Sequence, residues 1–155
     1  MTFGEELVLV LEKELDILMK LKELSFSKTD MIVDNHIHEL EQTTKDEENL
    51  INEMATLEEA REKLLDTWGI AINTPISNII ENLPENNESL ITIVDKMHDE
   101  MEELSLRNKL NNDLIKQNLD WIDFNMNFIT STNIEPGYGD ENKKSSRNHI
   151  FDRKV

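Results

Sequence analysis

Two long stretches of this chain lack both glycine and proline. Neither residue occurs between Gly4 and Gly69, or between Pro84 and Pro136. Glycine and proline are the residues that helices tolerate least, and Leu, Ile, Met, Glu and Lys fill these stretches instead, which is typical of long helices. Helices tens of residues long in a 155-residue chain form a rod and not a globular active site, and rods mostly bind other chains.

Cysteine is absent, which excludes disulfides and thiolate metal sites. The apolar run Leu7–Leu11 closes at Glu12 and is too short for a signal-peptide core or a membrane span. Aromatic residues make up only 5% of the chain, which suits a thin bundle with one buried stripe per helix. We expect a soluble cytoplasmic protein without a deep catalytic pocket.

Positive charge is scarce: the chain contains 16 Lys and Arg residues against 33 Asp and Glu residues, which gives a net charge of −17. Such a chain repels phosphate backbones and anionic membranes, so neither nucleic acid nor a membrane is an expected partner. The excess is localised, because residues 132–155 carry +1 and residues 1–131 therefore carry −18. The acidic part and the near-neutral tail are expected to have different roles.

The first two helices have local signals at their ends. Thr2 and Glu5 have the spacing of a capping box, which predicts a helix start. A break is expected near Asp34 and Asn35, and Gly69 suits the left-handed position that follows a helix.

Thr74 and Pro75 read as the N-cap and first turn of a short helix over 76–83. Asn86 or Asn87 is expected to cap a third long helix that runs to residue 131. The prediction is thus all-α: an elongated antiparallel helical bundle of three long helices and one short helix over residues 1–131, with a flexible C-terminal tail over 132–155.

The end of the last long helix carries two apolar rows. The first fits the continuing 3-4 repeat and comprises Ile115, Leu119, Ile122, Met126 and Ile129, and we call it the aliphatic row. The second, which we call the aromatic row, comprises Leu110, Leu114, Trp121, Phe124 and Phe128. Either both rows are buried inside the bundle, or the aromatic row is a groove for an amphipathic client helix, with Met97, Met101 and Met126 as adaptable contacts.

Three asparagines, Asn108, Asn111 and Asn118, interrupt the apolar stripe of the same helix. They either fix helix register, as buried asparagine does in coiled coils, or face solvent where the bundle ends.

Histidines and acidic clusters do not form a recognisable site. His36 and His38 are two residues apart and point to different sides of a helix. His98 follows Asp95 in one acidic-x-x-His unit, whereas a di-iron bundle needs two such units and two more carboxylates. With no phosphate loop or nucleophile motif either, we expect no metal, no cofactor and no enzyme activity.

Several segments, in their order and spacing, resemble the FlgN family of bacterial flagellar export chaperones. Leu40–Leu65 resembles the family's second helical segment, and Thr74–Pro84 (TPISNIIENLP) its short connecting helix. Asn108–Phe124 (NKLNNDLIKQNLDWIDF) resembles the Asn-rich end of the last helix, and PGYGDEN at Pro136–Asn142 the tyrosine-glycine motif beyond it. The ending IFDRKV is similar to tails of flagellar proteins.

The resemblance implies a chaperone that holds the hook-filament junction proteins FlgK and FlgL by their helical termini and passes them to the export gate protein FlhA. It places gate docking at Tyr138, and the client-binding strip is then the aromatic row. The alternative is a structural coiled-coil scaffold that self-associates through that same row. The sequence leaves monomer against dimer open.

Overall fold

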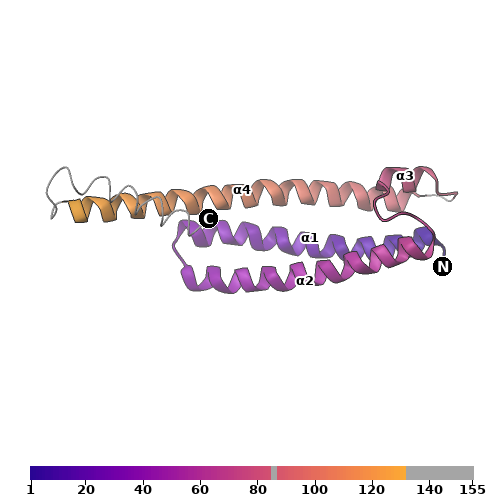
Figure 1. Ribbon diagram of the computed structural model, residues 1–155, viewed down its shortest axis with the longest axis horizontal. Coiled ribbons are helices and arrows are strands. Elements are labelled where there is room, and N and C mark those ends of the chain that lie inside the picture. The colour runs from indigo at the N-terminus through magenta and orange to yellow at the C-terminus, as the bar shows by residue number, and fades with distance from the viewer. Residues whose placement is uncertain (85–86, 132–155) are drawn as a thin grey trace. The chain divides into compact units, whose positions relative to one another are not determined.

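The computed structural model describes residues 1–84 and 87–131, and they form four helices (Figure 1). These are α1 (Phe3–Val33), α2 (Ile37–Thr67), α3 (Ile76–Glu81) and α4 (Glu88–Ser131). The described residues contain no strand, so the predicted all-α class with three long helices and one short helix is confirmed. No helix in this part of the chain is long and apolar enough to cross a membrane.

The chain divides into two compact units, the first over Met1–Lys109 and the second beginning at Leu110. Helix α4 supplies residues to both. The predicted boundary between residues 131 and 132 stays a prediction, because residues 132–155 lie outside the described part of the chain.

Three helix ends follow the local sequence signals. The backbone amide of Glu5 donates to the Thr2 hydroxyl at 3.2 Å, and the Thr2 amide donates to the Glu5 carboxylate at 3.0 Å, which completes the capping box. The predicted break falls at Asn35, whose φ of 57° is left-handed and turns the chain between α1 and α2. Gly69 has a φ of 71° just after α2, as its position predicted.

Helix α3 is shorter than expected. It begins at Ile76 with Pro75, and not Thr74, at the N-cap, and it ends at Glu81 instead of reaching residue 83. Pro84 disfavours helical geometry at the residue before it. The Asn82 side-chain amide also donates to the carbonyl of Asn78 at 2.8 Å, which closes the last turn early.

Asn87 directly precedes α4, and its backbone carbonyl accepts from the amide of Ile91 at 3.0 Å, as an N-cap residue does. Its side chain bonds α3 instead: the side-chain amide donates to the backbone carbonyl of Ile80 at 2.9 Å. Asn87 therefore ties the start of α4 to α3.

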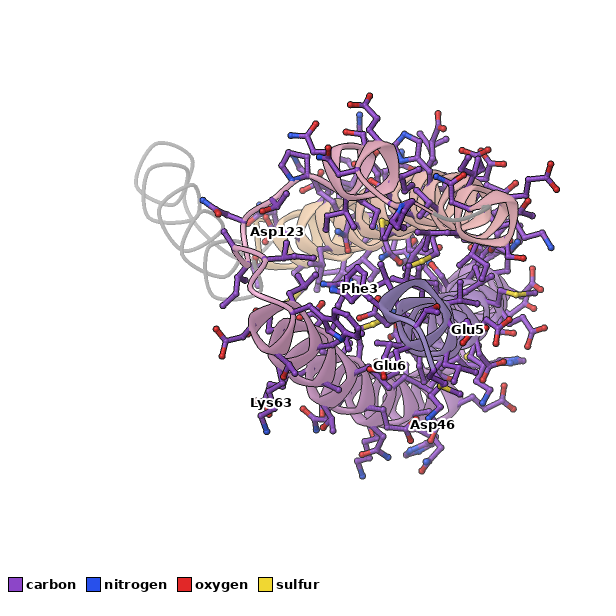
Figure 2. All side chains as sticks on the ribbon, turned by 90° about the vertical axis from the view of Figure 1, so that its right-hand side faces the viewer. Phe3, Glu5, Glu6, Asp46, Lys63 and Asp123 are labelled. Carbon is purple, nitrogen blue, oxygen red and sulfur yellow. The ribbon has the colours of Figure 1, made fainter. Side chains whose placement is uncertain are left out.

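Helix α1 is the centre of the first unit. Figure 1 shows it between α2 and residues 88–109 of α4. The end-on view in Figure 2 places Phe3 in the interior, whereas Lys63 and Asp46 of α2 point outward. The buried core combines four helices: Phe3, Leu7, Leu11, Leu18, Leu65, Ile79, Leu90, Ile93 and Met97.

One sequence expectation about burial is wrong. Met97 is only 7% exposed and belongs to the core, so it is not an adaptable surface contact. On α2, Ile37 and Ile51 are 65% and 56% exposed, and only Thr43 and Leu65 are buried. Because α2 packs along one face of α1, its remaining apolar side chains stay at the surface.

Ion pairs join α1 to both of its neighbours. The Lys22 ammonium lies 2.7 Å from Glu100 and 3.1 Å from Glu103 of α4, and the hydrogen bond to Glu100 is the main reason that the pKa of Lys22 is raised. Lys28 lies 2.9 Å from Glu47 of α2. Pairs of this kind contribute little stability each, but they favour one register over others.

Candidate interaction site

The second unit presents the aromatic row on α4. At about 100° per residue, positions 110, 114, 121, 124 and 128 share one side of a helix. Trp121, Phe124 and Phe128 are 66%, 62% and 64% exposed, Leu110 is 42% exposed, and Leu114 is half-buried. None of the five belongs to the core cluster of the first unit.

The aliphatic row lies on an adjacent side of the same helix. Ile115 and Leu119 are half-buried, and exposure rises toward the end of the helix, where Ile122, Met126 and Ile129 are 46%, 54% and 63% exposed. Both rows are therefore at the surface over the last three turns, and exposed apolar side chains in such number are typical of interaction sites.

Several polar groups of this stretch bond their own helix. The side-chain amide of Asn125 donates to the carbonyl of Trp121 at 2.7 Å, and the Thr130 hydroxyl donates to the carbonyl of Met126 at 2.7 Å. These two donors are therefore satisfied within the helix.

The interrupting asparagines have different environments. The Asn108 side-chain oxygen accepts a hydrogen bond at 2.6 Å from the hydroxyl of Ser25, which is fully buried on α1. Next to it, the Arg107 guanidinium lies 3.7 Å from the centre of the Phe26 ring and donates to Thr29 at 3.3 Å. Asn108 itself is exposed, so this bond links α1 to α4 but is not the buried contact that the register interpretation assumed.

The other two asparagines, Asn111 and Asn118, lie in the second unit. Asn111 is 2% exposed, whereas Asn118 is exposed. A single explanation for all three asparagines does not hold.

A groove in the first unit contains residues that the sequence analysis did not single out. It has a volume of about 490 Å³ and an apolar lining that includes Leu11, Ile76 and Met101. Arg61 also lines it and donates from Nη1 to Glu14 at 2.7 Å. Glu14 is 1% exposed, and its position between Leu11 and Leu18 on the apolar stripe of α1 was the available signal.

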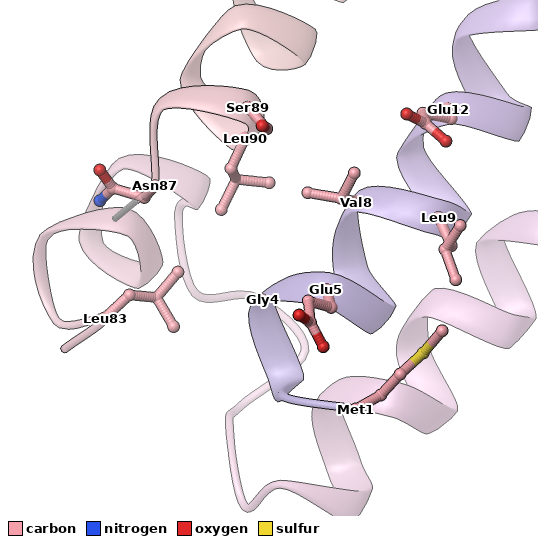
Figure 3. A pocket seen from close by; sticks show the side chains of 10 residues that line it. All are labelled: Met1, Gly4, Glu5, Val8, Leu9, Glu12, Leu83, Asn87, Ser89 and Leu90. Carbon is pink, nitrogen blue, oxygen red and sulfur yellow. The ribbon is translucent and has the colours of Figure 1, made fainter. Parts of the chain in front are cut away.

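A second pocket, of about 480 Å³, lies where α1 meets the start of α4 (Figure 3). In the close-up the side chains of Val8 and Leu90 point toward each other across it. Of its two carboxylates, Glu5 and Glu12, the first is held by the capping box and so has a structural role. The polar side chains that line this pocket do not point toward a common centre where a ligand could bind.

Titratable side chains do not gather into a reactive set in the described ranges. No group of three or more His, Cys, Asp or Glu residues there has the geometry of a metal site. His36 lies 3.2 Å from Glu39 in a contact on one exposed helical turn, and His98 and Asp95 line the groove described above. Tyr138, the expected gate-docking residue, lies outside the described residues.

A helical bundle whose last helix exposes a long apolar surface belongs to the class of proteins that act by binding other chains. The family model described as FlgN protein matches residues 1–146, and the chain belongs to the FlgN family. This confirms the resemblance drawn from the sequence. No curated protein and no solved structure matches the chain.

FlgN proteins are a chaperone family and not an enzyme family, and they bind flagellar proteins. Membership supports a general role as a flagellar export chaperone.

Proposed function

We propose that this chain is a cytoplasmic chaperone of flagellar type III export that binds the helical termini of FlgK and FlgL, keeps them in solution and delivers them to the gate protein FlhA. The client-binding residues are the aromatic row: Leu110, Leu114, Trp121, Phe124 and Phe128. The observation that carries the proposal is the exposure of Trp121, Phe124 and Phe128, each above 60%, on one side of α4 in a member of this family.

The physical basis is burial of aromatic surface by a helix that docks on the row. Each aromatic side chain can bury on the order of 150–250 Å², so three of them form the centre of a contact that reaches the roughly 1,000 Å² required for specific binding. Ordering the client terminus opposes this gain. Binding and release of this kind require neither a nucleotide nor a metal.

Acidity of the bundle supports the second part of the role. The −18 of residues 1–131 keeps loaded complexes apart by mutual repulsion while the client's apolar side chains are covered.

Delivery is assigned to Tyr138. A tyrosine between two glycines offers an apolar ring and a polar tip at low entropic cost, which suits a weak and reversible contact with the gate.

The second candidate is a scaffold that self-associates through the aromatic row, and the same exposed side chains favour it. The two functions differ in the free state. A chaperone is a monomer with the aromatic row exposed, whereas a scaffold is a tight symmetric dimer that buries the row. Light scattering of the purified chain measures the molar mass and so distinguishes the two.

The deciding experiment compares two double variants of the full chain. Trp121→Ser with Phe128→Ser removes the centre of the aromatic row, and Ile122→Ser with Ile129→Ser is the matched control on the aliphatic row. Capture of a peptide with a terminal helical sequence of FlgK should be lost in the first and retained in the second. Circular dichroism should show near-normal helicity in both.

Retained capture by the aromatic variant would refute the assignment of the client site. Unfolding of that variant would show that the aromatic side chains serve the core, since truncating buried aromatics costs about 3–5 kcal/mol each.

A further inference from the structure

One edge of the aromatic row carries two exposed carboxylates. Asp113 and Asp120 are seven residues apart, so they lie nearly one above the other on α4, about 20° apart around the axis. By the same geometry both lie within about 40° of the direction of Phe124, at the border of the row. No ion pair of either carboxylate is found among the described residues, and Lys116, one turn from each, lies farther around the helix from the row.

The opposite edge of the row is uncharged. Asn111, Asn118 and Asn125 also recur every seven residues, and they lie between the aromatic and the aliphatic rows. A helix that docks on the aromatic row therefore meets carboxylates along one side and no charge along the other, where Asn118 is exposed and Asn111 is buried. In paired helices, charges that flank an apolar seam select the partner and its orientation.

The same charges disfavour a second copy of this chain as the occupant. Residues 110–131 contain three Asp and one Lys, a net −2, so two copies packed through their aromatic rows would bring like charges together. A basic partner instead gains from both the local edge and the long-range field of residues 1–131, which carry −18.

From this arrangement we infer that the partner of the aromatic row is an amphipathic helix with Lys or Arg at seven-residue spacing along one edge of its apolar face, placed to meet Asp113 and Asp120. The inference rests on the proposed client-binding function and specifies the chemistry of the client segment. It also fixes how the client helix is rotated on the row, because only one of its edges is basic.

The test uses two synthetic helical peptides of three heptads with the same leucine face. They differ only in the two edge positions that flank it, which are Lys in one peptide and Glu in the other. With the full-length wild-type chain at low ionic strength, the Lys peptide should bind about tenfold more tightly, equivalent to about 1.4 kcal/mol. This preference should shrink as salt is added.

A second experiment reverses the charges on the protein and is the more specific test. In Asp113→Lys with Asp120→Lys the preference should invert toward the Glu peptide. The matched control, Asp99→Lys with Glu102→Lys, changes the net charge equally but at exposed positions of α4 outside residues 110–131, and it should still prefer the Lys peptide.

An unchanged preference in the edge variant, or equal inversion in both variants, would overturn the inference. If both peptides bind equally well and lose binding in Trp121→Ser with Phe128→Ser, the charge inference fails while the client site stands. If neither peptide binds, or if that variant binds both normally, the client site itself is refuted and the inference with it.

Discussion

The Arg61 guanidinium donates a hydrogen bond to one oxygen of the Glu14 carboxylate at 2.7 Å, and the other oxygen, Oε1, is buried with no hydrogen-bond partner among the described residues. Burial raises the pKa of Glu14, with a smaller contribution from the nearby Glu58, and the charge of Arg61 only partly offsets this. A charged α1–α2 contact inside an apolar stripe is therefore incompletely compensated.

This contact predicts a pH-dependent stability. Because the pKa of Glu14 is higher in the folded chain than in the unfolded chain, the folded state holds the proton more tightly. The stabilisation is complete below the unfolded pKa, near 4.5, and is lost as the pH rises through the folded value. Urea unfolding of wild type and Glu14→Gln checks this. As the pH rises from about 4.5 through the folded pKa of Glu14, the free energy of unfolding of wild type should fall relative to that of the variant.

Other carboxylates titrate in both proteins, so the difference between the two curves is the informative quantity. A difference that stays constant from pH 4 to pH 8 would mean that Glu14 does not titrate differently in the folded chain.

The hydrogen bond between Ser25 and Asn108 predicts a measurable coupling between α1 and α4. In a double-mutant cycle of Ser25→Ala and Asn108→Ala, the coupling should be about 0.5–1.5 kcal/mol, as for a net intramolecular hydrogen bond. Thermal and urea unfolding of the four proteins supply the cycle. Additive effects would show that the 2.6 Å contact does not stabilise the fold.

The left-handed residue after α2 predicts a purely conformational cost. Gly69 has a φ of 71°, and an added Cβ would meet no heavy atom within 4 Å. Gly69→Ala should therefore lower the free energy of unfolding by about 1–2 kcal/mol through backbone strain alone. Asn35→Gly, at the other left-handed position, is the matched change in the reverse direction and should be neutral or stabilising. Equal losses in both variants would contradict this account.

The docking role proposed for Tyr138 predicts that its substitution changes the affinity for the gate protein but not the affinity for the client. Tyr138→Ala should leave the affinity for the client near wild type but weaken binding of the loaded chaperone to FlhA and lower client secretion. Removal of residues 140–155 should have a smaller effect. If the substitution instead reduced client affinity tenfold, about 1.4 kcal/mol, with gate binding unchanged, Tyr138 would belong to the client site.

Helix number and most helix ends were predictable because their causes are local. The Thr2–Glu5 capping box, the break at Asn35 and the end of α2 before Gly69 each depend on a few neighbouring residues. Helix α3 was predicted too long at its end because the Asn82 closure competes with the apolar pattern that continues to Leu83. The aromatic row was also visible in the sequence, since it depends only on spacing along one helix.

Burial could not be derived in the same way, because it depends on which neighbour covers each face. Met97 and Met101 are one turn apart, yet the first is in the core and the second is 47% exposed. The position of Glu14 on the apolar stripe of α1 indicates burial, but its pairing with Arg61 follows only from the packing of α2 against α1. The helices, the charge imbalance and the apolar rows follow from local sequence. Which apolar residues are covered and which charges are buried depends instead on contacts between helices distant in the chain.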